Sequence, residues 1–140
     1  PDTVELDVDI RTLPGQTGAD VRAMLDDILG DLAGSVEVHA AGDDSSTSSP
    51  IDTPLWDTLQ RASSALVGDA TCIPFLTVGA TDARFFRRLG ITAYGYGLFS
   101  PRLSYEDVAT MFHGDDERVD HDSLRLSTEL WEAVARDLLG

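Results

Sequence analysis

The sequence contains one cysteine, Cys72, among its 140 residues. A single thiol excludes a disulfide within the chain and is typical of a protein from a reducing compartment such as the cytoplasm. No apolar run approaches the roughly 18 residues that a membrane-spanning helix needs, and no signal-peptide pattern opens the chain. We therefore expect neither an internal disulfide nor a membrane segment.

Basic residues are also few, ten against twenty-five acidic ones, which gives a net charge of -15. Such a surface repels the phosphate backbones of nucleic acids and anionic membranes, so neither is an expected partner. Hydrophobic residues make up 42% of the chain, which is enough for a packed core. The length allows one ordinary domain or two small pieces that share a partner.

The first forty residues have the pattern of a strand, a helix and a second strand. Apolar and polar residues alternate strictly from Val4 to Ile10, as in a strand with one buried face. Thr17 can cap a helix with one apolar stripe, and "SVEVHA" (35–40) follows as the second strand. The serine-rich stretch 41–50 is typical of a linker, so we place a domain boundary there.

The rest of the chain alternates helices with short strands. Thr53-Pro54 opens a helix whose apolar stripe contains Leu59, and the last helix is predicted over 122–139 with Leu130, Trp131, Val134 and Leu138 buried. Short strands are predicted at 72–78 and 91–97, with a short helix between them that ends before Gly90. This order predicts an α/β layer with a partly parallel sheet.

Of the three histidines, His113 is the best candidate for chemistry. It lies in "FHGDDER" (112–118), beside Gly114 and among carboxylates. Zinc sites take imidazole and carboxylate ligands, a glycine lets the backbone approach closely, and nearby acids can hold the ring tautomer. From spacing alone, one histidine without a close second ligand is more typical of a polar residue in a charged turn than of a metal ligand. His39 and His121 are expected to be a polar strand end and a capping or surface residue.

Arg11 ends the polar face of the first predicted strand, two residues after Asp9. A guanidinium held there can grip a carboxylate with two hydrogen bonds, or it can simply pair with Asp9. In "GATDARFFRR" (79–88), Thr81 or Asp82 can cap the short helix, or this turn can bind an anionic group of a substrate. The basic cluster Arg84, Arg87 and Arg88 is explained as well by a solvated face or by ion-pair partners.

Three blocks, taken together and in this order, resemble the M20 metallopeptidases and amidohydrolases: "VDIRTLPGQT" (8–17), "GATDARFFRRLGITAYGYG" (79–97) and "FHGDDERV" (112–119). That family includes aminoacylases, carboxypeptidases, succinyl-diaminopimelate desuccinylase and acetylornithine deacetylase. The resemblance implies an α/β (α+β) chain: residues 1–43 as the second half of a ferredoxin-like βαββαβ lid, and residues 44–140 as the C-terminal α/β part of a zinc-peptidase catalytic domain. The lid usually mediates dimerisation.

The resemblance also implies roles for single residues. His113 matches a ligand of a centre with two Zn²⁺ ions, for which Co²⁺ or Mn²⁺ can substitute. Arg11 matches the lid arginine that binds a substrate carboxylate, and Thr81 a residue near that carboxylate. The implied substrate is an N-acyl amino acid or a peptide with a free carboxylate. Supporting positions are Gly79, Asp82, Gly114 and Glu117.

The sequence departs from the family pattern in what it does not contain. The HxD block, the Glu-Glu pair that supplies the general base, and the first half of the lid have no counterpart here. The interpretation is therefore a C-terminal segment that is inactive alone and works with the missing N-terminal part, as a homodimer through the lid. The alternative is a non-catalytic assembly module with a vestigial site, whose incomplete sheet invites strand addition.

Overall fold

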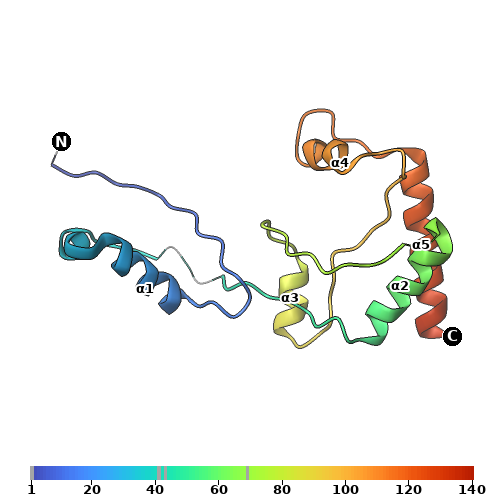
Figure 1. The fold of residues 1–140 in the computed structure, drawn as a ribbon, viewed down its shortest axis with the longest axis horizontal. Coiled ribbons are helices and arrows are strands. Elements are labelled where there is room, and N and C mark those ends of the chain that lie inside the picture. Colours follow the sequence, from blue (N-terminus) through green and yellow to red (C-terminus); the bar gives the residue numbers. More distant parts are fainter. Residues whose placement is uncertain (1, 41, 43, 69) are drawn as a thin grey trace. The chain divides into compact units, whose positions relative to one another are not determined.

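The structure is a computed structural model that describes residues 2–40, 42, 44–68 and 70–140. Its regular elements are all helical (Figure 1): α1 (Gly18–Leu29), the 3₁₀ helix η1 (Gly30–Ser35), α2 (Pro54–Val67), α3 (Ala83–Arg88), α4 (Tyr105–Met111) and α5 (His121–Leu139). None of the helices in these ranges combines the length and apolar character needed to cross a lipid bilayer.

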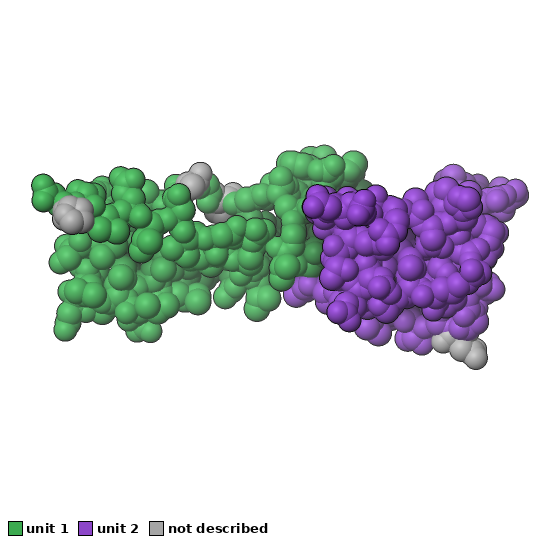
Figure 2. Space-filling model, turned by 90° about the horizontal axis from the view of Figure 1, so that it is seen from above, with its two compact units in different colours: residues 1–49, 77–93 green, residues 50–76, 94–140 purple. Residues whose placement is uncertain are grey.

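The chain divides into two compact units, coloured separately in Figure 2. Unit 1 contains Pro1–Ser49 and Thr77–Ala93, and unit 2 contains Pro50–Leu76 and Tyr94–Gly140. Unit 1 thus holds α1, η1 and α3, while unit 2 holds α2, α4 and α5. The domain boundary that we placed after residue 43 stays a prediction.

The core of unit 2 lies between α2 and α5. Leu59 of α2 is 1% exposed and Leu130 of α5 is 0% exposed, and Val134 completes the cluster. The predicted apolar stripe of α2 is confirmed, since Leu55, Ala62 and Leu66 pack against this cluster together with Leu59. The surrounding side chains, partly buried, are Leu55, Ala62, Leu66, Tyr94, Tyr96 and Leu98.

The predicted buried face of α5 was partly wrong. Trp131 and Leu138 are 46% and 45% exposed, whereas Leu126 is buried with Leu130 and Val134. Leu126, Leu130 and Val134 occupy positions i, i+4 and i+8, and the small polar Ser123, three residues before Leu126, is buried as well. Ser123 accepts a hydrogen bond from the amide of Ser100 at 2.8 Å, so a polar residue is satisfied at a buried position that an apolar pattern does not predict.

Local capping explains where the helices begin. Thr17 accepts a hydrogen bond from the amide of Asp20, and Asp20 accepts one from the amide of Thr17, which is a capping box at the start of α1. Thr53 caps α2 with Pro54 in its first turn, as predicted. Asp120 caps α5 by accepting from the amides of the next turn.

No strand is present in the described ranges, so the predicted α/β class is not observed and the molecule is helical where it is regular. Of the segments predicted as strands, 4–10, 72–78 and 91–97 lie outside regular secondary structure, and so do residues 36–40 of the segment 35–40, whose first residue ends η1. A strand is held by hydrogen bonds to a neighbour, and alternation alone supplies none. The apolar side chains of the first segment remain exposed, Val4 at 77%, Leu6 at 85% and Val8 at 69%.

The apolar stripe of α1 is unburied for the same reason. The helix forms where predicted, but it contains no buried residue, and Met24 and Ile28 are 52% and 77% exposed. A helix covers a sheet face only when that sheet exists. The ferredoxin-like lid therefore stays a prediction for residues 1–43.

Candidate functional site

The loop that carries His113 follows directly after α4 in unit 2. His113 has a left-handed backbone, with φ at 58°, a conformation that is uncommon outside glycine but is adopted more often by asparagine, aspartate and histidine than by other residues. Its side chain is exposed, and its ring meets that of Phe112 edge to face, with centroids 5.9 Å apart. Asp116 in the same loop is also left-handed, with φ at 61°, so this conformation is shared within the loop and does not single out His113.

Two neighbours shape this loop. Glu117 Oε2 accepts a hydrogen bond from the amide of His113 at 3.3 Å, so in this structure its carboxylate supports the loop backbone. The amide of Gly114 donates to the carbonyl of Met111, and a Cβ at Gly114 would lie 3.0 Å from the carbonyl oxygen of Thr110. Only a residue without a side chain fits there without a shift of backbone.

The side chains of the described residues do not complete a zinc site. Zinc takes four ligands, of which at least three come from the protein. Among the described residues there is no group of three or more His, Cys, Asp or Glu side chains that could hold a metal ion. His39 pairs with Glu37 at 3.2 Å, and His121 is the exposed first residue of α5, capped by Asp120 and not itself the cap.

In unit 1, Arg11 contacts the segment that leads into the "GATDAR" turn. Its Nη1 donates to the carbonyl of Val78 at 3.1 Å, and its Nη2 donates to Asp9 Oδ2 at 2.6 Å. The pairing with Asp9 that we held as an alternative is thus present. Both side chains are well exposed, at 59% and 68%, and such a pair adds little stability.

The turn itself leaves its polar side chains available. Asp82 occupies the cap position of α3 but makes no capping hydrogen bond with its side chain, so the simple capping explanation does not describe it. Thr81 uses its carbonyl to accept from the amide of Arg84. Gly79 donates its amide to Thr77 Oγ1 at 3.3 Å, and a Cβ at this glycine would meet only an ordinary contact at 3.7 Å.

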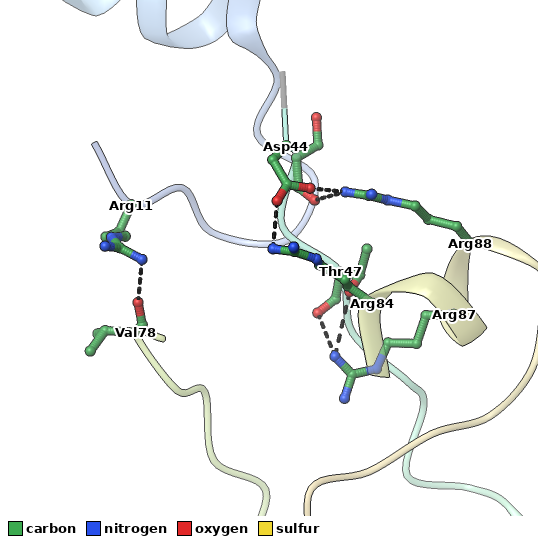
Figure 3. A network of polar contacts seen from close by, with 8 residues as sticks. Arg11, Asp44, Thr47, Val78, Arg84, Arg87 and Arg88 are labelled. Carbon is green, nitrogen blue, oxygen red and sulfur yellow. Dashed lines mark hydrogen bonds and ion pairs between the residues drawn. The ribbon is translucent and has the colours of Figure 1, made fainter. Parts of the chain in front are cut away.

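Sequence reasoning missed the partner of the basic residues on α3 (Figure 3). Asp44 accepts hydrogen bonds from Arg84 Nη1 at 2.6 Å and from Arg88 Nη2. The hydrogen bond from Arg88 and the charge of Arg84 hold the pKa of Asp44 below its ordinary value. Arg87 reaches Thr47, donating to its carbonyl at 3.3 Å. Ion-pair partners were one of two explanations for the cluster, but no spacing rule connects it to a stretch forty residues earlier.

A second unpredicted cluster lies in unit 2 around Tyr96. Its hydroxyl lies 2.8 Å from Ser63 Oγ and 2.9 Å from Cys72 Sγ. Partial burial, with the hydrogen bond to Cys72, raises the pKa of Tyr96. Gln60 Oε1 accepts from the amide of Cys72 at 2.6 Å, which holds this segment against α2. These contacts hold Cys72 and Tyr96 against α2, so Cys72 has a structural role here.

Comparison with known proteins gives one finding. The family model described as peptidase family M20/M25/M40 matches residues 4–137, nearly the whole chain. No curated protein and no solved structure matches it.

Proposed function

Because the chain belongs to peptidase family M20/M25/M40, a family of hydrolases, we propose that it is the C-terminal segment of a metal-dependent enzyme of this family. The proposed substrate is an N-acyl amino acid or a peptide with a free carboxylate, and the reaction is hydrolysis of its amide bond. Residues 1–43 belong to the lid in this proposal, and residues 44–140 to the catalytic domain.

One observation supports this proposal above the others. Arg11 and Val78 are sixty-seven residues apart in the chain, and yet Arg11 Nη1 donates to the carbonyl of Val78, the residue directly before the "GATDAR" turn. A guanidinium beside a turn with free hydroxyl and amide groups is a suitable receptor for a carboxylate, because it can offer two parallel hydrogen bonds while the turn offers more. Arg11 is the proposed clamp, and Thr81 the second contact.

The pairing of Arg11 with Asp9 is compatible with that role. Both groups are exposed, so their attraction is screened by water and contributes little. A substrate carboxylate that gains two hydrogen bonds from Arg11 replaces Asp9 at small cost. In the absence of substrate, Asp9 pairs with Arg11 and keeps its guanidinium near the turn.

His113 is the proposed metal-binding residue of this segment. The described residues do not fit a zinc centre by themselves, since no further ligands gather around this imidazole. The proposal therefore assigns His113 one coordination bond and leaves the other ligands to the N-terminal part of the enzyme. Glu117 and Gly114 hold the loop in shape, and the isolated chain is proposed to be inactive.

A second candidate function is assembly without catalysis. Val4, Leu6 and Val8 alternate with polar residues in an exposed segment that pairs with no strand among the described residues, and such a segment is suited to forming a strand against another chain. In this case the site is vestigial. The two functions differ in whether Arg11 recognises a carboxylate.

Calorimetric titration of the 140-residue chain with N-acetylmethionine tests the clamp, and the primary amide of the same compound is the matched ligand without a carboxylate. We expect weak, saturable binding of the acid, at least tenfold weaker binding of the amide, and loss of the difference in Arg11→Gln. Arg22→Gln is the control variant, because Arg22 pairs with Asp26 on α1. Equal binding of acid and amide by the unchanged chain would refute the clamp and favour the assembly module.

A further inference from the structure

The stretch predicted as a linker is bound to α3 in unit 1. We call Arg84, Arg87 and Arg88 the arginine cluster; these residues occupy positions i, i+3 and i+4 of α3. Figure 3 shows all three side chains extending toward the segment that contains Asp44 and Thr47. The contact is polar throughout, and it brings three guanidinium groups together in a chain whose net charge is -15.

The fold neutralises only part of this positive charge. Arg84 and Arg88 share the one carboxylate of Asp44. Within the described ranges Arg87 contacts neutral oxygens alone: its Nε donates to the carbonyl of Ala93 at 2.8 Å, and its Nη1 to the carbonyl and hydroxyl of Thr47 at 3.3 and 3.4 Å. Two of the three positive charges therefore have no carboxylate of their own among the described residues.

Donor groups are also left over. Each guanidinium has five N–H donors. Arg84 uses Nη1 alone, and its Nε is enclosed without an acceptor in the part of the chain that the structure describes. Arg88 uses Nη2 alone in its described contacts. Buried donors normally find acceptors, so this arrangement lacks an acceptor that is rich in oxygen and carries negative charge.

We propose that the arginine cluster, together with Thr47, binds a phosphate group. A phosphate dianion or monoester carries about two negative charges and three strong acceptor oxygens, which match the two unneutralised charges and the unused donors. The proposal does not depend on the hydrolase function. The proposed effect of the phosphate is to hold the segment 44–49 more firmly against α3.

The phosphate has two possible sources with the same chemistry. One is inorganic phosphate that binds from solution. The other is a phosphate ester on Thr47 Oγ1, which a protein kinase forms from a nucleoside triphosphate. In that transfer the Oγ1–P bond forms, the bond between the γ-phosphorus and its bridging oxygen breaks, the nucleoside diphosphate leaves, and the hydroxyl proton passes to the kinase. Arg87 already lies 3.4 Å from Thr47 Oγ1, so it is the first guanidinium to meet either form.

The first arm titrates the full 140-residue chain with inorganic phosphate and follows the binding by calorimetry at constant ionic strength. We expect saturable binding that weakens at least tenfold in Arg87→Gln and in Arg88→Gln. Two variants are used because Arg87 also holds the carbonyl of Ala93, and its loss alone can disturb the local fold. Arg22→Gln, on α1, is the control and keeps the affinity of the unchanged chain.

The second arm uses a semisynthetic chain with phosphothreonine at position 47 and measures amide hydrogen exchange over residues 44–49 and 83–88. If the ester is the natural source, exchange there slows at least tenfold relative to the unmodified chain, and Arg87→Gln abolishes the effect. If free phosphate is the source, the first arm shows saturable binding and the ester changes exchange less than twofold. Absence of saturable binding in the first arm together with unchanged exchange in the second overturns the proposal.

Discussion

Thr58 Oγ1 on α2 donates a hydrogen bond of 2.5 Å to Asp137 Oδ2 on α5. Thr58 is 1% exposed, and Arg61, three residues further along α2, also donates to the same oxygen at 2.5 Å. The contact therefore fixes the register between the two helices that form the core of unit 2. It lies beside the apolar cluster of Leu59, Leu130 and Val134, since Thr58 directly precedes Leu59 and Asp137 follows Val134 by three residues.

Replacing this hydroxyl by a methyl group isolates the polar contribution to the helix pairing. We expect Thr58→Val to lower the free energy of unfolding by about 1.5–3 kcal/mol, because the volume is kept while the hydroxyl loses its hydrogen bonds to two charged groups, the Asp137 carboxylate and the Arg61 guanidinium, which donates to Thr58 Oγ1 at 3.0 Å. Urea denaturation followed by circular dichroism measures the change. Thr128→Val is the control, since that hydroxyl donates only within α5, to the carbonyl of Leu124. Equal losses in the two variants would contradict the interhelical role.

Acid should lower the stability of the chain by protonating four aspartates that accept hydrogen bonds near helix ends. Hydrogen bonds from Thr17, Ser104, Ser123 and Thr58 hold the pKa values of Asp20, Asp107, Asp120 and Asp137, respectively, below the ordinary value of 3.8. A lowered pKa in the folded state means that the unfolded chain binds protons more tightly. The stabilisation is complete above pH 3.8 and is lost as the pH falls through the lower values of the folded state.

The test compares variants, because acid also relieves the repulsion among the many carboxylates. We expect Asp120→Asn to be less stable than the unchanged chain at pH 6, and this difference to shrink steadily below pH 3.8. Asp115→Asn serves as control, since the Asp115 carboxylate makes no hydrogen bond or ion pair among the described residues. A difference that stays constant from pH 6 to pH 3 would show that Asp120 does not act through its charge.

The loop around His113 can be tested at Gly114. A Cβ there meets the carbonyl oxygen of Thr110 at 3.0 Å, so Gly114→Ala must displace backbone, and we expect a loss of about 1–3 kcal/mol in the stability of this region. Faster amide hydrogen exchange in α4 would measure this loss of stability. Gly95→Ala, where nothing lies within 4 Å of the added carbon, should have no comparable effect. Equal exchange in both variants would mean that the loop is not closely packed.

The large negative charge predicts that the chain gains stability from salt. Carboxylates outnumber basic groups by fifteen, so self-repulsion opposes the compact state and dissolved ions screen it. We expect the thermal midpoint to rise as KCl goes from 0.1 to 1 M. The rise should be smaller in Glu5→Gln/Asp7→Asn, and unchanged in the charge-conserving Asp7→Glu. A midpoint that falls with KCl would contradict the expected repulsion.

Helices could be predicted from this sequence where their signals are local. Thr17 and Thr53 cap α1 and α2 as expected, because a capping side chain needs only the next turn of its own chain. The last helix and its buried Leu130 were also predicted from spacing alone. The error at Trp131 arose because a stripe of apolar residues is wider than the contact with one neighbouring helix.

Strands and the site could be predicted less well, because both depend on distant partners. Alternation in 4–10 predicts which face a strand would bury, but a strand forms only when another backbone pairs with it. Asp44 was assigned to a linker, and its contact with Arg84 has no signature in sequence spacing. His113 was identified as a candidate, whereas its left-handed backbone depends on how α4 ends and could not be foreseen.

In the proposed function, this chain supplies His113 to a family M20 hydrolase whose other catalytic groups lie in the N-terminal part of the enzyme. The most direct measurement mixes the 140-residue chain with a polypeptide that carries the family's HxD and Glu-Glu blocks, and follows hydrolysis of N-acetyl amino acids with added zinc. We predict no hydrolysis by either piece alone, hydrolysis by the mixture, at least a hundredfold loss in His113→Ala and no loss in His121→Ala. Hydrolysis that survives His113→Ala, or none from pieces that demonstrably associate, would contradict the account.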